Sequence, residues 1–178
     1  AKTKLLIFNS PHNPTGKIFS KEQLLELAGL VMKHDFYFLS DEVYEKLVYP
    51  DQINFSLASM KELAERVITI NSFSKSFSMT GWRIGYLVAP LAIAQHIAEM
   101  QHHINTNVCT FVQKGSCAAF SISNDYFSSF NSLLQKNALE LQRMVARNNT
   151  LRLVPPQGSQ FCFLNISGLG LGSDEFCS

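Results

Sequence analysis

Residues Ser72–Tyr86 read SFSKSFSMTGWRIGY and carry four serines, a lysine and an arginine. On either side stand runs rich in apolar and β-branched residues, RVITIN at 66–71 and IGYLVA at 84–89. Such runs are typical of buried strands, so residues 72–83 are predicted to form a polar loop between two strands. A loop held by the end of a buried strand often carries binding or catalytic groups, because the sheet positions it rigidly. Ordinary surface charge is the alternative for its lysine and arginine.

Strands and helices alternate on the N-terminal side of this loop. Ser20 and Gln23, three residues apart, predict a capping box at the start of a helix. The alternation favours an α/β fold with a parallel sheet. The strand at 84–89 follows the loop with no crossover helix, so we expect it to run antiparallel beside the others. The expected strands are 4–8, 36–39 and 66–71, and the expected helices are 21–34 and 57–65.

The C-terminal part is predicted to be mainly helical, with one further strand. The expected helices are 90–103, 109–120 and 124–148. The run VPPQG at 154–158 breaks this pattern, and FCFLNI at 161–166 is predicted to be a strand. Ser173 is then predicted to cap a helix that stops after a few residues. A domain does not normally end there, so we expect the chain to be a portion of a longer protein.

The composition argues against several classes of function. The chain has 178 residues, 46% of them hydrophobic, and a net charge of +1, which gives no indication of a nucleic-acid partner. No apolar run approaches the roughly 20 residues needed to span a bilayer, so no membrane partner is expected. The four cysteines form no Cys-x-x-Cys pair, which favours free thiols and a reducing, cytoplasmic location.

Two patterns that suggest ligands have simpler explanations. His102 and His103 are adjacent, but neighbouring side chains on a helix diverge by about 100°, so no metal site is expected. The run GLGLG at 168–172 is similar to a dinucleotide-binding fingerprint. Its third glycine comes one residue early and no βαβ unit can follow, so we expect a surface loop.

Three polar positions follow the three parallel strands. Asn13 comes after the first strand, Asp41 ends the second, and Lys75 comes after the third. The carboxyl ends of parallel strands lie at one edge of the sheet, where open α/β folds bind ligands. Pyridoxal 5'-phosphate is a ligand that needs such a set of groups. Its aldehyde reacts with a lysine, its ring nitrogen pairs with an acid, and its phosphate needs hydroxyls and a guanidinium.

Three motifs carry a family resemblance. NSPHNPTG at 9–16, SDEVYE at 40–45 and the run at 72–86 resemble the class I/II aminotransferases, the fold-type I enzymes that depend on pyridoxal phosphate. PQGSQF at 156–161 is similar to the entry into the small domain of that family. The resemblance implies a three-layer α/β sandwich with a mostly parallel sheet, followed by the start of a small α+β domain.

The same resemblance implies how the chain is divided. Residues 1–123 would be part of the cofactor-binding large domain. Residues 124–150 would form the long inter-domain helix, and residues 151–178 would begin the small domain.

The resemblance also implies roles at the cofactor ring. Lys75 would form the Schiff base and, once displaced by substrate, would move the proton between the substrate Cα and the cofactor C4'. Asp41 would hold the pyridine nitrogen protonated. Asn13 and Tyr44 would hydrogen-bond the phenolic oxygen.

The phosphate would be held by a second set of residues. Arg83, eight residues beyond Lys75, would pair with the phosphate, because a planar fork of donors suits it. Ser72 and Ser74 would add hydroxyls, although one of them could only brace the loop.

Structural roles for individual residues stay open at this point. Asp41 is also compatible with an N-cap of a turn at 42–47. Asn13 is compatible with an Asn-Pro turn, and Tyr44 with a purely structural role. Trp82 is interpreted as a packing residue.

The leading hypothesis is an aminotransferase that acts on an amino acid and a 2-oxo acid, normally as a homodimer. A lyase or decarboxylase of the same fold is the second hypothesis, and a cofactor-binding domain of a transcription regulator is the third. The family arginine that clamps the substrate carboxylate is not found in this chain. We therefore expect the chain alone neither to fold stably nor to turn over substrate.

Overall fold

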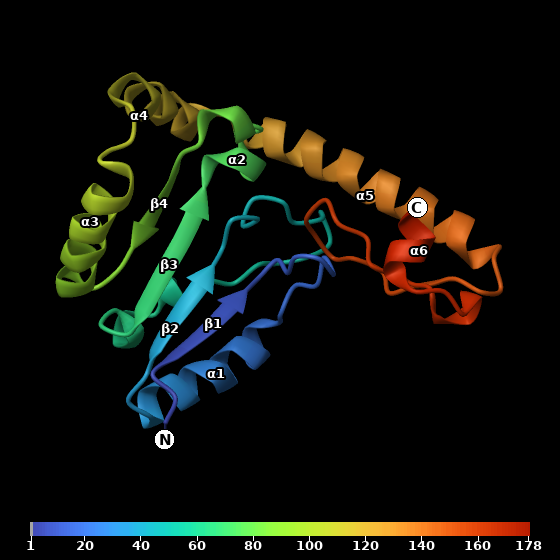
Figure 1. The fold of residues 1–178 in the computed structure, drawn as a ribbon, viewed down its shortest axis with the longest axis horizontal. Helices are drawn as coiled ribbons and strands as arrows, with labels where there is room; N and C mark the ends of the chain where they lie inside the picture. The colour runs from blue at the N-terminus through green and yellow to red at the C-terminus, as the bar shows by residue number, and fades with distance from the viewer. Residues whose placement is uncertain (1) are drawn as a thin grey trace.

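The computed structural model describes residues 2–178. The expected large-domain segment 1–123 begins at residue 1, which lies outside the described part. The main sheet consists of β1 (Leu5–Asn9), β2 (Tyr37–Asp41), β3 (Val67–Ser72) and β4 (Gly85–Val88). The strands lie in that order, as Figure 1 shows. β1, β2 and β3 are parallel, whereas β4 runs antiparallel to β3. The predicted α/β fold with a mostly parallel sheet and an antiparallel fourth strand is therefore confirmed.

The helix α1 (Lys21–Lys33) covers one face of the sheet. Ser20 and Gln23 form the predicted capping box, in which each side chain binds the backbone N–H of the other residue. Phe38 of β2 lies fully buried under this layer. Buried apolar surface contributes about 25 cal/mol per Å², so the core cluster between α1 and the sheet stabilises their packing. The buried core cluster is Leu24, Ala28, Val31, Phe36, Phe38, Leu57, Leu63 and Val67.

The predicted helix at 57–65 is wrong in kind, since two short 3₁₀ helices take its place. They are η1 (Leu57–Ser59) and η2 (Lys61–Leu63), and the extended backbone of Met60 separates them. A 3₁₀ turn has three residues, so positions three apart lie on the same side. Leu57, Met60 and Leu63 can then all pack on the core. Tertiary packing has overridden the helical propensity of this segment.

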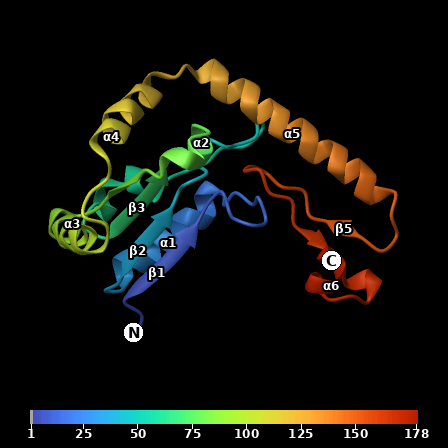
Figure 2. The same cartoon turned by 45° about the horizontal axis from the view of Figure 1, so that its top comes forward.

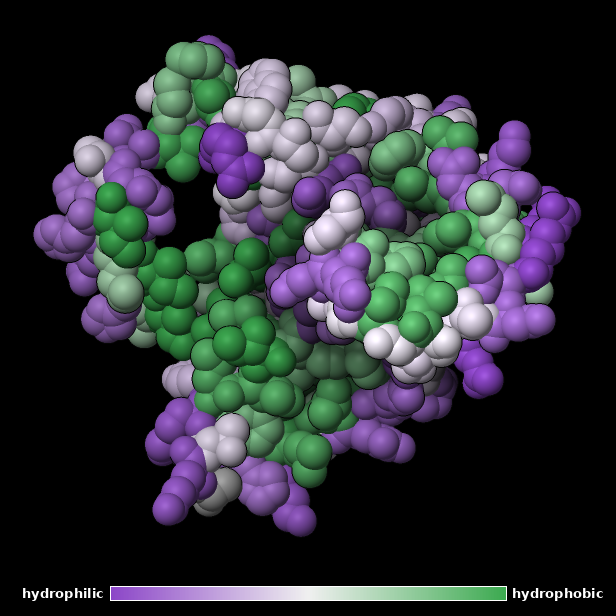
Figure 3. All heavy atoms as spheres, turned by 45° about the vertical axis from the view of Figure 1, so that its right-hand side comes forward, coloured by the Kyte–Doolittle hydropathy of each residue, from purple (hydrophilic) through white to green (hydrophobic). Residues whose placement is uncertain are grey.

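The opposite face of the sheet is largely open. Ile7 of β1 is 69% exposed, and its neighbours Leu5 and Tyr37 are exposed as well. Helix α3 (Leu91–Asn105) lies beside β3 and β4, but a cavity of about 560 Å³ separates it from Ile70 and Leu87. Hydrophobic residues accordingly gather over the sheet in Figure 3. The apolar surface that this sheet presents is larger than its own helices cover.

The remaining elements link the sheet to the C-terminal part. The expected helix 109–120 is α-helical only in its first half and continues as a 3₁₀ helix, where the helix tightens before its end. The elements are α2 (Phe73–Ser76), η3 (Thr80–Trp82), α4 (Thr110–Ser116), η4 (Cys117–Ser121) and α5 (Asn124–Ala146). Figure 2 shows α5 leading away from the sheet, with the C-terminal segment beside it.

The C-terminal segment is less regular than predicted. Only β6 (Leu164–Asn165) of the expected strand 161–166 forms, and it pairs antiparallel with β5 (Arg152–Leu153). Because β5 has two residues, it can pair with two residues of the expected strand and not with the remainder. The helix α6 (Ser173–Cys177) starts at Ser173, so its N-cap is Gly172 rather than the expected serine. The 3₁₀ helix η5 (Ser167–Leu169) lies between them.

Residues 157–159 return to the main sheet and lie between two of its loops. The backbone N–H groups of Gln157 and Gly158 donate to the carbonyl of Gly16 (2.8 and 3.0 Å), and that of Ser159 donates to Leu47 (2.6 Å). Gly16 has a positive φ of 69°, and a Cβ there would lie 2.5 Å from Cβ of Pro156. Glycine is therefore required at this crossing. The division of the chain at 123 and 150 stays a prediction.

The structure also bears on the expectations about membranes, metals, thiols and the GLGLG run. No helix among residues 2–178 has the length and apolar character to cross a membrane. Within that range no group of three or more His, Cys, Asp or Glu residues is arranged to hold a metal ion. All four cysteines are free. In the GLGLG run, Gly168 packs tightly, because a Cβ there would lie 2.4 Å from the carbonyl oxygen of Thr150.

Candidate functional site

The carboxyl ends of β1 and β2 are joined directly. Asn9 and Asp41 are register partners, and Nδ2 of Asn9 donates to the carbonyl oxygen of Asp41 at 2.9 Å. The backbone N–H of Ser10 donates to the same oxygen at 3.2 Å. The loop that follows β1 is thereby fixed beside Asp41, as the parallel sheet predicts.

Asn13 and Tyr44 contact each other across these two loops. Nδ2 of Asn13 donates to the Tyr44 hydroxyl at 3.4 Å, and the backbone N–H of Asn13 donates to Oδ1 of Asn9 at 2.7 Å. Tyr44 is buried, and its ring packs edge-on against Phe161. Burial raises the pKa of the Tyr44 phenol, while the hydrogen bond from Asn13 lowers it and the nearby Asp41 carboxylate raises it further. The amide and the phenol therefore lie at one place, as their shared expected role requires.

Asp41 stands at the end of β2 with its carboxylate already oriented. Its Oδ1 accepts a hydrogen bond from the backbone N–H of Val43 at 3.2 Å. This is the local contact of the structural alternative, although residues 43–46 form a turn and not a helix. A carboxylate has further lone pairs, so this bond leaves capacity for another donor. The contact is compatible with both roles of Asp41.

Lys75 lies in the short helix α2, directly after β3. Its side chain is half-buried, and among residues 2–178 it takes part in no ion pair. The next residue ties the helix to the Asp41 turn, because Oγ of Ser76 donates to the carbonyl oxygen of Val43 at 3.5 Å. The Lys75 amine therefore lies on a helix fixed to the same edge, and no ion pair among residues 2–178 occupies it.

Ser72 and Ser74 have different surroundings. Oγ of Ser72 accepts the backbone N–H of Ser74 at 3.1 Å, which makes Ser72 the N-cap of α2, and it reaches the carbonyl oxygen of Ile84 at 3.5 Å. Ser72 is thus the serine that braces the loop. Within residues 2–178 the hydrogen bond of Ser74 comes from its backbone N–H and none from its hydroxyl, so its hydroxyl is the freer of the two.

Arg83 is exposed at the start of the segment that leads into β4. Its φ is 52°, in the left-handed region, and its Nη1 donates to the carbonyl oxygen of Thr80 at 3.0 Å. A non-glycine residue in this region is uncommon and directs attention to its surroundings. Trp82 beside it is 45% exposed and packs over Gly115, where a Cβ would lie 2.9 Å from the indole ring. The packing interpretation of Trp82 thus has a defined contact.

Glu42 is a hydrogen-bonded residue near this edge that the sequence predictions do not include. Glu42 is only 4% exposed, and its Oε1 accepts hydrogen bonds from Oγ of Ser40 (2.8 Å) and Oγ of Ser56 (2.6 Å). Burial raises the pKa of the Glu42 carboxyl, although both hydroxyl hydrogen bonds act in the opposite direction. The alternation in β2 could have placed Ser40 and Glu42 on one side, but nothing local indicates Ser56.

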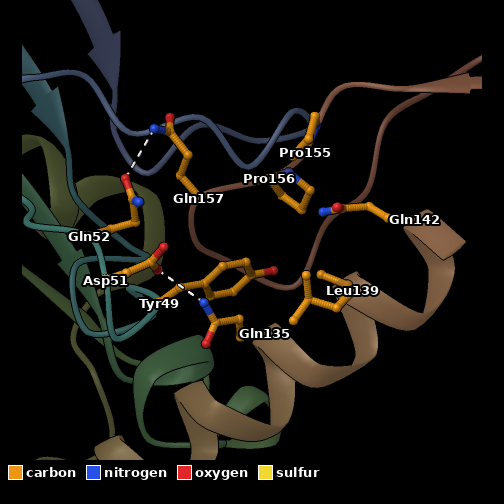
Figure 4. Close-up of a pocket in the computed structure, with 10 residues that line it drawn as sticks. Tyr49, Asp51, Gln52, Gln135, Leu139, Gln142, Pro155, Pro156 and Gln157 are labelled. Atoms are coloured by element: carbon orange, nitrogen blue, oxygen red, sulfur yellow. Dashed lines mark hydrogen bonds between the residues drawn. The ribbon is translucent and has the colours of Figure 1, made fainter.

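A separate pocket of about 210 Å³ lies where α5 meets the returning C-terminal segment (Figure 4). Gln135 of α5 donates to Asp51 at 3.0 Å, and Gln157 donates to Gln52 at 3.1 Å. Its lining contains no lysine or arginine, so its chemistry does not suit a phosphate. Its described lining residues are Tyr49, Asp51, Gln52, Gln135, Ala138, Leu139, Gln142, Pro155, Pro156 and Gln157.

The donor set at the sheet edge, in contrast, fits pyridoxal phosphate. Three loops from one edge supply an amine without an ion pair among residues 2–178, a carboxylate with free lone pairs, an amide–phenol pair, hydroxyls and a guanidinium. These are the groups that the aldehyde, the ring nitrogen, the phenolic oxygen and the phosphate need. The chemistry of the residues present is therefore compatible with this cofactor.

Known proteins with similar sequences include several that are transaminases by name. Aromatic-amino-acid aminotransferase 2 of Thermococcus litoralis is 37% identical over 177 residues, which are 98% of this chain and 45% of that protein. Kynurenine–oxoglutarate transaminase 3 of Mus musculus is 37% identical over 186 residues, covering 98% and 41%. The chain thus spans less than half the length of these relatives.

Solved structures agree with the sequence relatives. The aromatic aminotransferase of Pyrococcus horikoshii OT3 superimposes with a TM-score of 0.88 at 36% identity, covering 98% of this chain and 47% of that one. The aspartate aminotransferase of Rhizobium meliloti gives a TM-score of 0.88 at 26% identity, covering 93% and 42%. Residues 1–177 match the family described as aminotransferase class I and II, and the chain belongs to that family.

Proposed function

We propose that the protein carrying this chain is a pyridoxal-phosphate-dependent aminotransferase that moves an amino group between an amino acid and a 2-oxo acid. The observation that carries the proposal is the meeting of three loops at one sheet edge, where Asn13 contacts Tyr44 and the helix of Lys75 is tied to the Asp41 turn. Relatives named for aromatic amino acids, aspartate and kynurenine support the reaction class and differ in substrate.

Two residues act at the reacting centre in this proposal. Pyridoxal phosphate, when bound, supplies an aldehyde that condenses with amines and a ring that accepts the electron pair of a broken bond. Lys75 would hold the aldehyde and, when free, would be the base that moves a proton between the substrate Cα and the cofactor C4'. Asp41 keeps a proton on the ring nitrogen, since a carboxylate favours a neighbouring positive charge.

The other residues orient the cofactor. Asn13 and Tyr44 donate to its phenolic oxygen, for which the Tyr44 phenol must stay protonated, and its raised pKa favours that state. Ser72, Ser74 and Arg83 bind the phosphate. Ser74 is the better hydroxyl donor, because the Ser72 hydroxyl already braces the loop.

The proposed setting is a cytoplasmic homodimer. The four free thiols support a reducing compartment. Exposed apolar residues such as Phe111 and Ile104 support burial against further protein.

The test uses the complete protein. Reduction with borohydride after addition of pyridoxal phosphate should fix the cofactor to Lys75, as peptide mapping would show. Lys75→Arg keeps the charge but should lose the label and at least about a thousandfold in turnover, since a positioned base alone gives 10²–10⁴. Lys114→Ala, an exposed lysine on α4, is the control and should retain both.

Two results would contradict the proposal. A label on another lysine would remove Lys75 from the mechanism. Release of pyruvate and ammonia from an amino acid without any 2-oxo acid acceptor would favour the lyase of the same fold.

A further inference from the structure

Glu42 is a buried acid to which the proposed function gives no role. It lies one residue beyond Asp41, yet its side chain turns to the opposite side, where Ser40 and Ser56 both donate to one of its oxygens. Ser56 comes from the N-cap of η1, fourteen residues away, and it also accepts the backbone N–H of Ala58. A carboxyl group at 4% exposure has lost most of its water, so these hydroxyls replace its solvation.

The backbone of Glu42 is fixed as firmly as its side chain. Its N–H donates to the carbonyl oxygen of Ile70 in β3 at 2.9 Å, and its carbonyl accepts the N–H of Glu45 at 2.8 Å. Glu42 therefore joins the strand β3 to the turn that follows β2. The turn starts with the Asp41 carboxylate and contains the Tyr44 phenol, and the Val43 N–H binds Oδ1 of Asp41.

The charges around Glu42 argue against an ion pair. The nearby carboxylates of Asp41 and Glu45 both raise its pKa. No lysine or arginine of residues 2–178 forms a salt bridge with it. What the site uses is therefore an acceptor at a fixed position, which an uncharged amide can also supply.

We propose that Glu42 is a positioning residue, which clamps the Asp41–Tyr44 turn to β3 and η1 and so holds the Asp41 carboxylate and Tyr44 phenol where the cofactor ring is bound. The clamp consists of the Ser40, Ser56 and Ile70 contacts. Its effect on the cofactor rests on the proposed function, whereas its effect on the turn does not. Small displacements of such supporting groups have large effects on binding and catalysis.

The experiment compares three variants of the complete protein. Glu42→Ala removes the acceptor, Ser40→Ala removes one donor, and Glu42→Gln keeps an acceptor of the same shape. We expect the dissociation constant of pyridoxal phosphate to rise about tenfold in Glu42→Ala and less in Ser40→Ala, by analogy with supporting residues elsewhere. The pH midpoint of the visible cofactor band should shift in the same two variants. Glu42→Gln should stay within about twofold of the wild type.

A cofactor-free readout separates the two proposals. Amide hydrogen exchange at Val43 and Glu45, measured without pyridoxal phosphate, should be faster in Glu42→Ala and unchanged in Glu42→Gln. If the wild type bound no cofactor, but exchange at Val43 and Glu45 were still faster in Glu42→Ala and unchanged in Glu42→Gln, the proposed function would be overturned and the clamp supported.

Three outcomes would overturn the clamp. One is that Glu42→Ala has the same cofactor dissociation constant, band midpoint and amide exchange rates as the wild type, and differs from it only by a lower melting temperature. Another is a Glu42→Gln variant as impaired as Glu42→Ala, because the charge would then matter and not the position. The third applies if Glu42→Ala does not fold: unchanged cofactor binding and unchanged amide exchange in Ser40→Ala would then contradict the clamp.

Discussion

Asp41 is held at three points by its own chain: Asn9 and Ser10 donate to its carbonyl oxygen, and Val43 donates to its carboxylate. Its position after a strand is visible in the sequence, because carboxyl ends of parallel strands meet at one edge. The same reasoning places Asn13 and Lys75. What the sequence does not reveal is which polar group is already engaged, since that depends on partners such as Ile84 for Ser72 and Ser56 for Glu42.

Tyr49 gives a pH-dependent prediction at this scale. Burial, with a smaller contribution from Cys162, raises its pKa from 10.0 to about 12. The neutral phenol is favoured in the folded state, so its contribution to stability is complete below pH 10 and is lost as the pH rises from 10 to about 12. The melting temperature of the complete protein should therefore fall as the pH rises through this window. Tyr49→Phe should reduce that fall. Tyr37→Phe, on the exposed face, should leave it in place; an equal slope in all three proteins would contradict the prediction.

At the scale of elements, regular segments are predictable and those set by distant partners are not. The capping box and apolar spacing of α1 and the β-branched run of β3 predict their structure locally. The sequence predicts a helix from residue 57, but residues 57–63 bend into two 3₁₀ turns, because Leu57 and Leu63 both reach the core. The strand at 161–166 shrinks to two residues, since its partner β5 is itself two residues long.

Gly16 provides a prediction about one of these loops. Alanine there would have a positive φ of 69° and a Cβ 2.5 Å from Pro156. We expect Gly16→Ala to lower the free energy of unfolding of the complete protein by more than the roughly 1–2 kcal/mol of a left-handed residue, because the clash adds to it. Chemical denaturation measures the change.

Gly29 is the matched control for this substitution. It lies in α1, and among residues 2–178 no atom apart from the neighbouring backbone of this helix lies within 4 Å of an added Cβ. Gly29→Ala should raise the free energy of unfolding by up to about 1 kcal/mol. If both substitutions changed stability alike, the special conformation of Gly16 would not be required.

On the scale of the whole molecule, the fold class and the family follow from the sequence, whereas the open surfaces do not. Periodicity places Leu5 and Ile7 in a strand but does not tell that one face of the sheet stays uncovered. Among residues 2–178, β1 and β4 each pair with one strand of the sheet, so their outer edges carry unpaired backbone groups. The chain also spans less than half the length of its relatives.

The isolated 178-residue chain should accordingly behave poorly in solution. Exposed apolar residues on the open face and unpaired strand edges favour self-association over a stable monomer. Size-exclusion chromatography should show aggregates or broad peaks, and no transaminase activity should be measurable. A monodisperse monomer with a cooperative thermal transition and turnover would contradict this expectation.

The crossing of residues 157–159 has a mechanical consequence. Helix α5 has 23 residues and is therefore about 35 Å long, and the chain that follows it returns to bind Gly16 and Leu47. Each of these lies three residues from a proposed cofactor contact, Asn13 and Tyr44 respectively. A displacement of residues 157–159 would therefore move both loops together, and the amide and the phenol with them.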